Sequence, residues 1–148
     1  MSAAEWMELA RRCETGSEDA GLDADICVLA QYGYTGRKGS NFRCNEIWGE
    51  LLLVSDIDGI ESFDVVPELS TCVDSGIAII EETLPGCFWS VNGLRSPGGK
   101  YVAHIHTADM SEESEGVSAS ASTSALALRW AFCLARQWVG SGSAVMTP

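Results

Sequence analysis

The stretch that decides the fold reads Thr123-Ser-Ala-Leu-Ala-Leu-Arg-Trp-Ala-Phe-Cys-Leu-Ala-Arg-Gln-Trp-Val139. Apolar residues recur along it with helical spacing, at Leu128, Ala131, Phe132, Ala135 and Trp138. This spacing places them along one face of an α-helix. Thr123 can cap the start of the helix, and Gly140 can end it. The pattern therefore predicts a central helix over 123–139, whose apolar stripe must be covered by a sheet or another helix.

Three further helices are predicted upstream. Ser2 and Glu5 form a capping box before an apolar pattern with helical spacing, which predicts a helix over 3–14. A second helix is expected from Ser17 to just before Gly33, so that 1–33 forms a helical pair. Ser70 or Thr71 together with Asp74 marks the start of a middle helix near 71–83.

Strands are expected between and after these helices. The firmest is a hairpin over 87–107, in which the turn 95–99 joins two apolar stretches. The stretches 51–54 and 60–66 predict an irregular hairpin or extended pair. The run 34–43, with two glycines and three basic residues, is expected to be an exposed loop.

The sequence predicts one α+β domain over 1–148. An antiparallel sheet with a C-terminal hairpin is covered by helices, and the N-terminal helices are an extra element. The sheet and the middle helix occupy 34–107. The serine- and glutamate-rich segment 108–122 is expected to be a mobile acidic linker, and 140–148 a tail without evident structure.

Composition excludes several classes of partner. Twenty-one acidic residues against nine basic ones give a net charge of −12, which disfavours general nucleic-acid binding and anionic membranes. Neither a membrane span nor a signal peptide is evident, so a cytoplasmic location is expected. The six cysteines show no C-x-x-C pair and indicate reduced, mostly buried thiols.

Two arginines are the best functional lead. Arg129 and Arg136 are two helical turns apart, so they are expected to project from nearly the same face and to hold a phosphate or carboxylate. The competing interpretation is ordinary salt bridges to the many acids. Trp130 can supply a stacking surface beside the arginines. The basic residues of the loop are expected to join the two arginines if the fold or a second subunit brings them close: Arg37, Lys38 and Arg43.

Catalytic and metal motifs are weak. His104 and His106 share one face of a predicted strand, as two zinc ligands would, but a third ligand is missing. The chain has no G-x-x-x-x-G-K-[ST] phosphate loop and no G-x-S-x-G elbow. No cofactor is therefore expected, and an enzymatic role is the less favoured interpretation.

Parts of the sequence resemble a known family. These parts are Leu22-Asp23-x-x-Ile26, the stretch from Ser70 to Leu84-Pro-Gly-Cys-Phe-Trp-Ser90, and Thr123-x-Ala-Leu-Ala-Leu128 before the last helix. Together they resemble small phage and prophage proteins, some described as phage ABA (alpha-beta-alpha) sandwich proteins. The resemblance covers roughly 17–138, except 34–66, and the first helix is extra. It implies a phage accessory protein and no catalytic residue.

Three functional classes follow from these observations. The first is a non-enzymatic phage accessory protein that binds a small anionic ligand or a host protein, with sequestration of a nucleotide immune signal (an anti-defence role) as its most concrete form. The second is a structural component of the virion. The third is a metal-dependent enzyme that uses His104 and His106. Five tryptophans in so short a chain also favour a homo-oligomer, because aromatic residues are enriched at interfaces.

Overall fold

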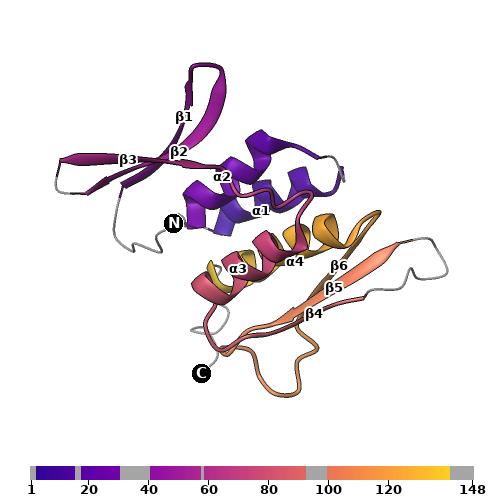
Figure 1. The fold of residues 1–148 in the computed structure, drawn as a ribbon. Coiled ribbons are helices and arrows are strands. Elements are labelled where there is room, and N and C mark those ends of the chain that lie inside the picture. Colours follow the sequence, from indigo (N-terminus) through magenta and orange to yellow (C-terminus); the bar gives the residue numbers. More distant parts are fainter. Residues whose placement is uncertain (1–2, 16–17, 31–40, 58, 93–99, 141–148) are drawn as a thin grey trace.

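The computed structural model describes residues 3–15, 18–30, 41–57, 59–92 and 100–140. The chain is an α+β protein with helices packed against antiparallel strands, as the sequence predicts, but the strands form two sheets where one was expected (Figure 1). In chain order the elements are α1 (Ala3–Cys13), α2 (Ala20–Ala30), β1 (Asn41–Ile47), β2 (Glu50–Ile57), β3 (Ile60–Val65), α3 (Val73–Thr83), β4 (Phe88–Val91), β5 (Tyr101–His106), β6 (Val117–Ala121) and α4 (Ser124–Gly140).

The elements lie in four layers. Strands β1, β2 and β3 form one antiparallel sheet, here the N-terminal sheet, and β4, β5 and β6 form a second, the C-terminal sheet. Figure 1 shows the α1–α2 pair between the N-terminal sheet and the layer that α3 and α4 make. The C-terminal sheet lies on the other side of α4. The helices therefore occupy the middle of the protein and each sheet forms an outer layer.

Helix α4 is the central element. It packs against β5 and β6 on one side and against α1 and α3 on others. The predicted cap is present, since the Leu126 backbone N–H donates to the Thr123 hydroxyl oxygen at 3.2 Å. The prediction of a single apolar stripe is too narrow, because residues 125–129 are buried without interruption. The several alanines allow neighbours to approach the helix from several directions.

Helix α1 covers the side of α4 that faces away from the C-terminal sheet, and α2 packs on α1 (Figure 1). Trp6 is fully buried, and its ring meets that of Phe132 edge to face with 5.7 Å between centroids. The predicted helix over 3–14 is confirmed as α1, and the second predicted helix is confirmed as α2. The predicted caps Ser2 and Ser17 lie outside the described residues.

The C-terminal sheet contains the predicted hairpin and one strand that was not predicted. Strands β4 and β5 pair antiparallel, and Ala103 and Ile105 of β5 are buried toward α4. The predicted linker over 108–122 is wrong in its second half, because β6 pairs with β5 there. The segment Val117-Ser-Ala-Ser-Ala121 alternates small apolar and polar residues, and Ala119 and Ala121 are buried in the core.

The N-terminal sheet has one strand more than expected. The predicted extended pair is confirmed as β2 and β3. The predicted basic loop over 34–43 is wrong for its last three residues, which begin β1, and 34–40 lies outside the described residues. Strands β1 and β2 are joined at Trp48 and Gly49, with φ of 54° and 83°. Two consecutive positive φ values are typical of a type I′ turn, which suits the twist of a hairpin.

The middle helix begins slightly later than expected. It starts at Val73, with Cys72 as its N-cap and without a side-chain capping bond.

Within the described ranges, no helix combines the length and apolarity that a membrane crossing requires. The tail beyond Gly140 lies outside the description.

One glycine is required by a close backbone approach. Gly116 precedes β6 with φ of 78°, and a Cβ atom there would lie 2.4 Å from the carbonyl oxygen of Ile105. Gly59 has nearly the same φ, 79°, but a Cβ atom there would meet nothing within 4 Å. Alanine substitutions at the two positions therefore separate the free-energy cost of the left-handed backbone conformation from that of the steric clash.

We expect Gly116→Ala to lower the free energy of unfolding by about 3 kcal/mol or more, because it adds a backbone clash to the cost of a left-handed alanine. Gly59→Ala should cost only about 1–2 kcal/mol, the conformational part alone. Urea denaturation of the two variants beside the wild type measures the difference. Equal losses in both variants would contradict the close approach at Gly116.

Candidate functional site

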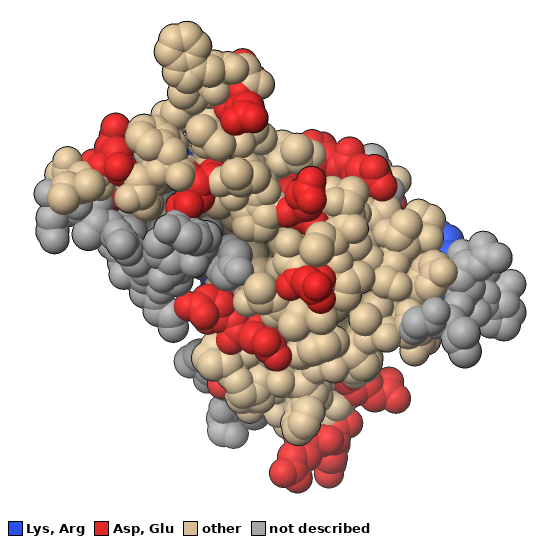
Figure 2. Space-filling view, in the orientation of Figure 1, with Lys and Arg blue, Asp and Glu red and all other residues tan. Residues whose placement is uncertain are grey.

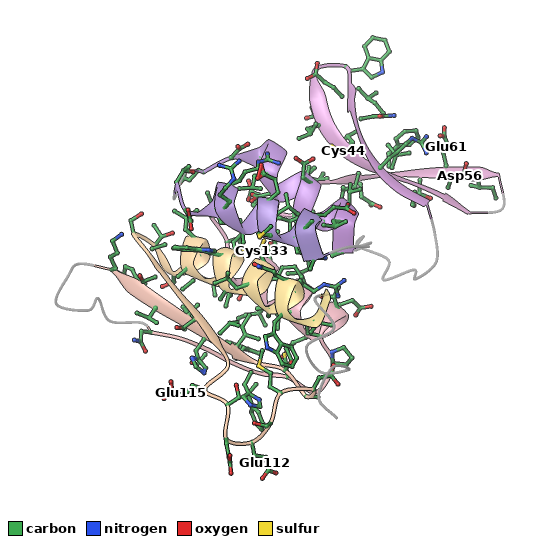
Figure 3. All side chains as sticks on the ribbon, turned by 180° about the vertical axis from the view of Figure 1, so that it is seen from behind. Cys44, Asp56, Glu61, Glu112, Glu115 and Cys133 are labelled. Carbon is green, nitrogen blue, oxygen red and sulfur yellow. The ribbon has the colours of Figure 1, made fainter. Side chains whose placement is uncertain are left out.

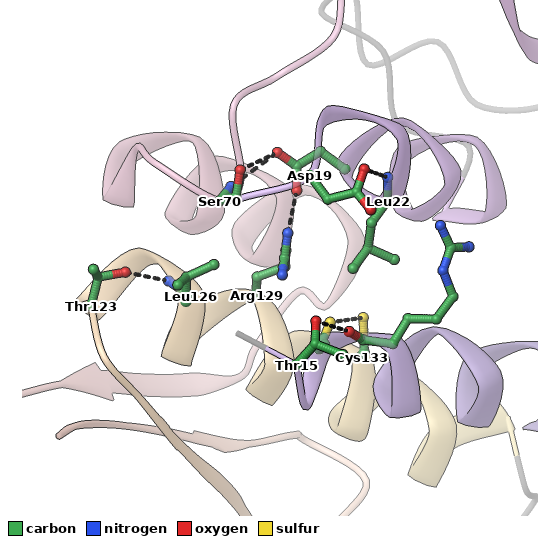
Figure 4. A network of polar contacts seen from close by, with 11 residues as sticks. Thr15, Asp19, Leu22, Ser70, Thr123, Leu126, Arg129 and Cys133 are labelled. Carbon is green, nitrogen blue, oxygen red and sulfur yellow. Dashed lines mark hydrogen bonds and ion pairs between the residues drawn. The ribbon is translucent and has the colours of Figure 1, made fainter. Parts of the chain in front are cut away.

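Arg129 lies inside the protein. Its side chain is almost fully buried, and one guanidinium nitrogen lies 2.9 Å from an Asp23 carboxylate oxygen, which is itself buried. The other Asp23 oxygen accepts hydrogen bonds from the Ser70 backbone N–H and hydroxyl, at 3.0 and 2.8 Å (Figure 4). The prediction that Arg129 projects outward is therefore wrong. The ion pair joins α4, α2 and the segment before α3.

Arg136 has a different set of partners. Its guanidinium carbon lies 5.0 Å from the centroid of the Trp6 ring, in a cation–π arrangement. It also donates a hydrogen bond to the carbonyl oxygen of Thr83, the last residue of α3, at 3.3 Å. Burial lowers the pKa of Arg136. Arg136 thus binds the negative end of α3, and the two arginines do not converge on one described cavity.

The remaining ligand candidates are dispersed. Arg37 and Lys38 lie outside the described residues. Arg43 is on β1 and forms an ion pair with Glu61 of β3. Trp130 is half-buried and lines a cavity of about 340 Å³ at one end of α1. The structure therefore does not bring the predicted anion-binding residues together.

The two histidines share one face of β5, as predicted. They alternate with the buried Ala103 and Ile105, so they lie on the face of the C-terminal sheet that α4 does not cover. The Nε2 atom of His106 lies 2.9 Å from the carbonyl oxygen of Ser111. In the described part of the chain, no three His, Cys, Asp or Glu side chains are placed to hold a metal ion.

A groove lies between the N-terminal helices and β1. It has a volume of about 630 Å³, and apolar side chains, among them Leu9, Val28 and Leu29, line much of it. Three carboxylates and one guanidinium also line it: Glu5, Glu8, Asp25 and Arg43. Such a lining repels a small anion more than it attracts one.

The N-terminal sheet carries an exposed surface that the sequence analysis did not identify. Six large apolar side chains are exposed in the described residues, and four of them lie in this sheet or its turns: Trp48 (99%), Ile60 (70%), Phe63 (52%) and Val65 (76%). The strand register places Val65 opposite Leu52 and Phe63 opposite Val54, so these residues of β2 and β3 share one face, whereas Ile60 lies on the other. Val54 is fully buried, so Phe63 and Val65 are the large apolar side chains exposed on this face. Leu53 points to the other face and belongs to the core.

Acidic residues occupy the same face of the sheet. Asp56 and Glu61 are directly opposite each other in the register, and they continue the rows of Val54 and Phe63. Figure 3 shows both on the N-terminal sheet, on the other side of the helices from the C-terminal sheet. We call this surface the apolar–acidic face, and define it by Leu52, Asp56, Glu61, Phe63 and Val65. It can bind an apolar surface edged by positive charge.

Comparisons with protein-family models, with curated proteins and with solved structures find no significant match.

We expect Arg129→Ala to lower the free energy of unfolding by about 3–5 kcal/mol, because the Asp23 carboxylate would stay buried without its counter-charge. Arg11→Ala is the matched control, since Arg11 forms an exposed ion pair with Glu8 and its removal should leave the denaturation midpoint nearly unchanged. Chemical denaturation measures both. Equal midpoints for the two variants would mean that Arg129 is not an internal structural residue.

Proposed function

We propose that this chain is a non-enzymatic binding protein that docks a partner protein on the apolar–acidic face of its N-terminal sheet. The observation that carries the proposal is the exposure of two large apolar side chains, Phe63 and Val65, on one face of this sheet. Single exposed apolar residues are ordinary, but a contiguous group edged by polar residues is typical of a protein interface. Phe63 and Val65 are two residues apart on one strand and so form such a group.

The charge of the face indicates what kind of partner fits. Asp56 and Glu61 flank the apolar residues, Glu61 in its ion pair with Arg43, and the whole chain has a net charge of −12. Figure 2 shows acidic side chains spread over the visible face of the protein, with few basic ones. The complementary surface is therefore apolar at its centre and basic at its rim. A second copy of this chain fits less well, since it would place acidic rims against each other.

The resemblance to small phage proteins extends the proposal. On that basis the partner is a host protein, and the chain is a phage accessory protein that acts in the host cytoplasm. The small-anion version of this function has less support, because Arg129 and Arg136 are engaged with Asp23, Trp6 and Thr83. The virion and metal-enzyme alternatives gain no support from a described contact.

We expect the double variant Phe63→Asp/Val65→Asp to weaken partner binding by about 10-fold or more, because it removes the central apolar contacts of the interface. The tagged wild type is used to capture a partner from host extract, and the purified partner is then titrated calorimetrically against each variant. Raising the salt from about 50 to 200 mM should weaken binding, since the rim contacts are ionic.

Phe88→Asp is the matched control, because Phe88 is a similarly exposed aromatic residue (78%) on the C-terminal sheet. The proposal requires that this variant bind as the wild type does. Binding that is unchanged in Phe63→Asp/Val65→Asp would contradict it. Light scattering that shows a wild-type dimer, dissolved by the double variant, would instead assign the face to a second copy.

A further inference from the structure

Two thiols meet at the interface of the first and last helices. The sulfur atoms of Cys13 in α1 and Cys133 in α4 lie 3.8 Å apart, although the residues are 120 positions apart in the chain (Figure 4). Both side chains are buried, with 2% and 0% exposed. A disulfide has a sulfur–sulfur distance of about 2.05 Å, so the two atoms need to approach by only about 2 Å.

A cavity lies beside one of the two cysteines. The cavity of about 340 Å³ that Trp130 lines is also lined by Cys13, Lys100 and Ser122, whereas Cys133 does not line it. A water molecule occupies about 30 Å³ in the liquid, so a small hydroperoxide can enter a space of this size. An oxidant that enters the cavity therefore reaches Cys13 before Cys133.

The surroundings give the two thiols different reactivities. The hydrogen bond with Cys133 and the positive charge of Arg129 lower the pKa of the Cys13 thiol. Burial raises the pKa of the Cys133 thiol. Because the thiolate is the nucleophile in thiol oxidation, the cysteine that lines the cavity, Cys13, is also the more reactive one.

We propose that Cys13 and Cys133 are an oxidative modification site, at which hydrogen peroxide converts the two thiols into a disulfide that ties α1 to α4. The sulfur of Cys13 attacks the peroxide, so an S–O bond forms, the O–O bond breaks and water leaves. This step makes a sulfenic acid. The sulfur of Cys133 then attacks that of Cys13, which forms the S–S bond and releases a second water. Two thiols lose two electrons, and the peroxide gains them.

The other cysteines provide the comparison. Cys72 is only partly buried at the N-terminus of α3, where the backbone N–H of Ser75 lowers its pKa. It is the cysteine that direct, non-specific oxidation should attack first. Cys27 is fully buried, and burial raises its pKa. Oxidation of Cys13 and Cys133 in preference to Cys72 therefore distinguishes a specific oxidation site from general thiol oxidation.

The test treats the reduced full chain with a stoichiometric amount of hydrogen peroxide, in the Cys72→Ser background and in the wild type. We expect a mass loss of about 2 Da, the mass of the two hydrogens that a disulfide removes. A non-reducing peptide map should link Cys13 to Cys133. The melting temperature should rise by about 5 °C or more and fall back on reduction, since the crosslink closes a very long loop.

Two variants resolve the order of the steps. Cys133→Ala should stop the reaction at a sulfenic acid on Cys13, which dimedone traps, and Cys13→Ala should leave Cys133 unlabelled. The proposal is overturned if peroxide oxidises Cys72 or other thiols in the wild type while no Cys13–Cys133 peptide forms. That measurement needs no variant, so the proposal stays testable even if a substitution at this helix interface prevents folding.

Discussion

The buried ion pair between Arg129 and Asp23 constrains the whole arrangement of helices. Removing two charges from water costs several kcal/mol for each ion, and only close partners offset that cost. Here the Asp23 carboxylate receives hydrogen bonds from Arg129 and from both the backbone and the hydroxyl of Ser70. A packing that separated Arg129 from Asp23 would leave both charges buried without each other. The pair therefore selects one register of the helices more than it adds stability.

The elements built on local patterns were predictable, and the contacts between distant elements were not. The helical spacing of Leu128 and Phe132 and the cap at Thr123 locate α4 correctly. Nothing local shows that Arg129 has its partner 106 positions earlier, so a residue of the core was interpreted as a ligand site. The strand β6 was missed because Val117-Ser-Ala-Ser-Ala121 has too little apolar content to stand out in an acidic stretch.

The exposure of the apolar–acidic face could not be predicted from the sequence either. The alternation of Phe63 and Val65 with polar residues indicates a strand with one apolar face, and such a face is normally taken to be buried. The pairing register decides otherwise, because Leu53 of the neighbouring strand points into the core from the opposite face. A shift of one residue would exchange the two faces, and the sequence of a single strand does not specify that choice.

The packing of α1 against α4 also bears on how the chain acquires its structure during synthesis. The two helices form one of the largest contacts in the protein, yet almost the whole described chain separates them. An isolated helix of 11 residues, the length of α1, is only marginally stable in water. During synthesis on the ribosome, α1 therefore lacks its main packing partner until α4 has left the exit tunnel. Its apolar side, which includes Trp6, stays available to chaperones throughout that interval.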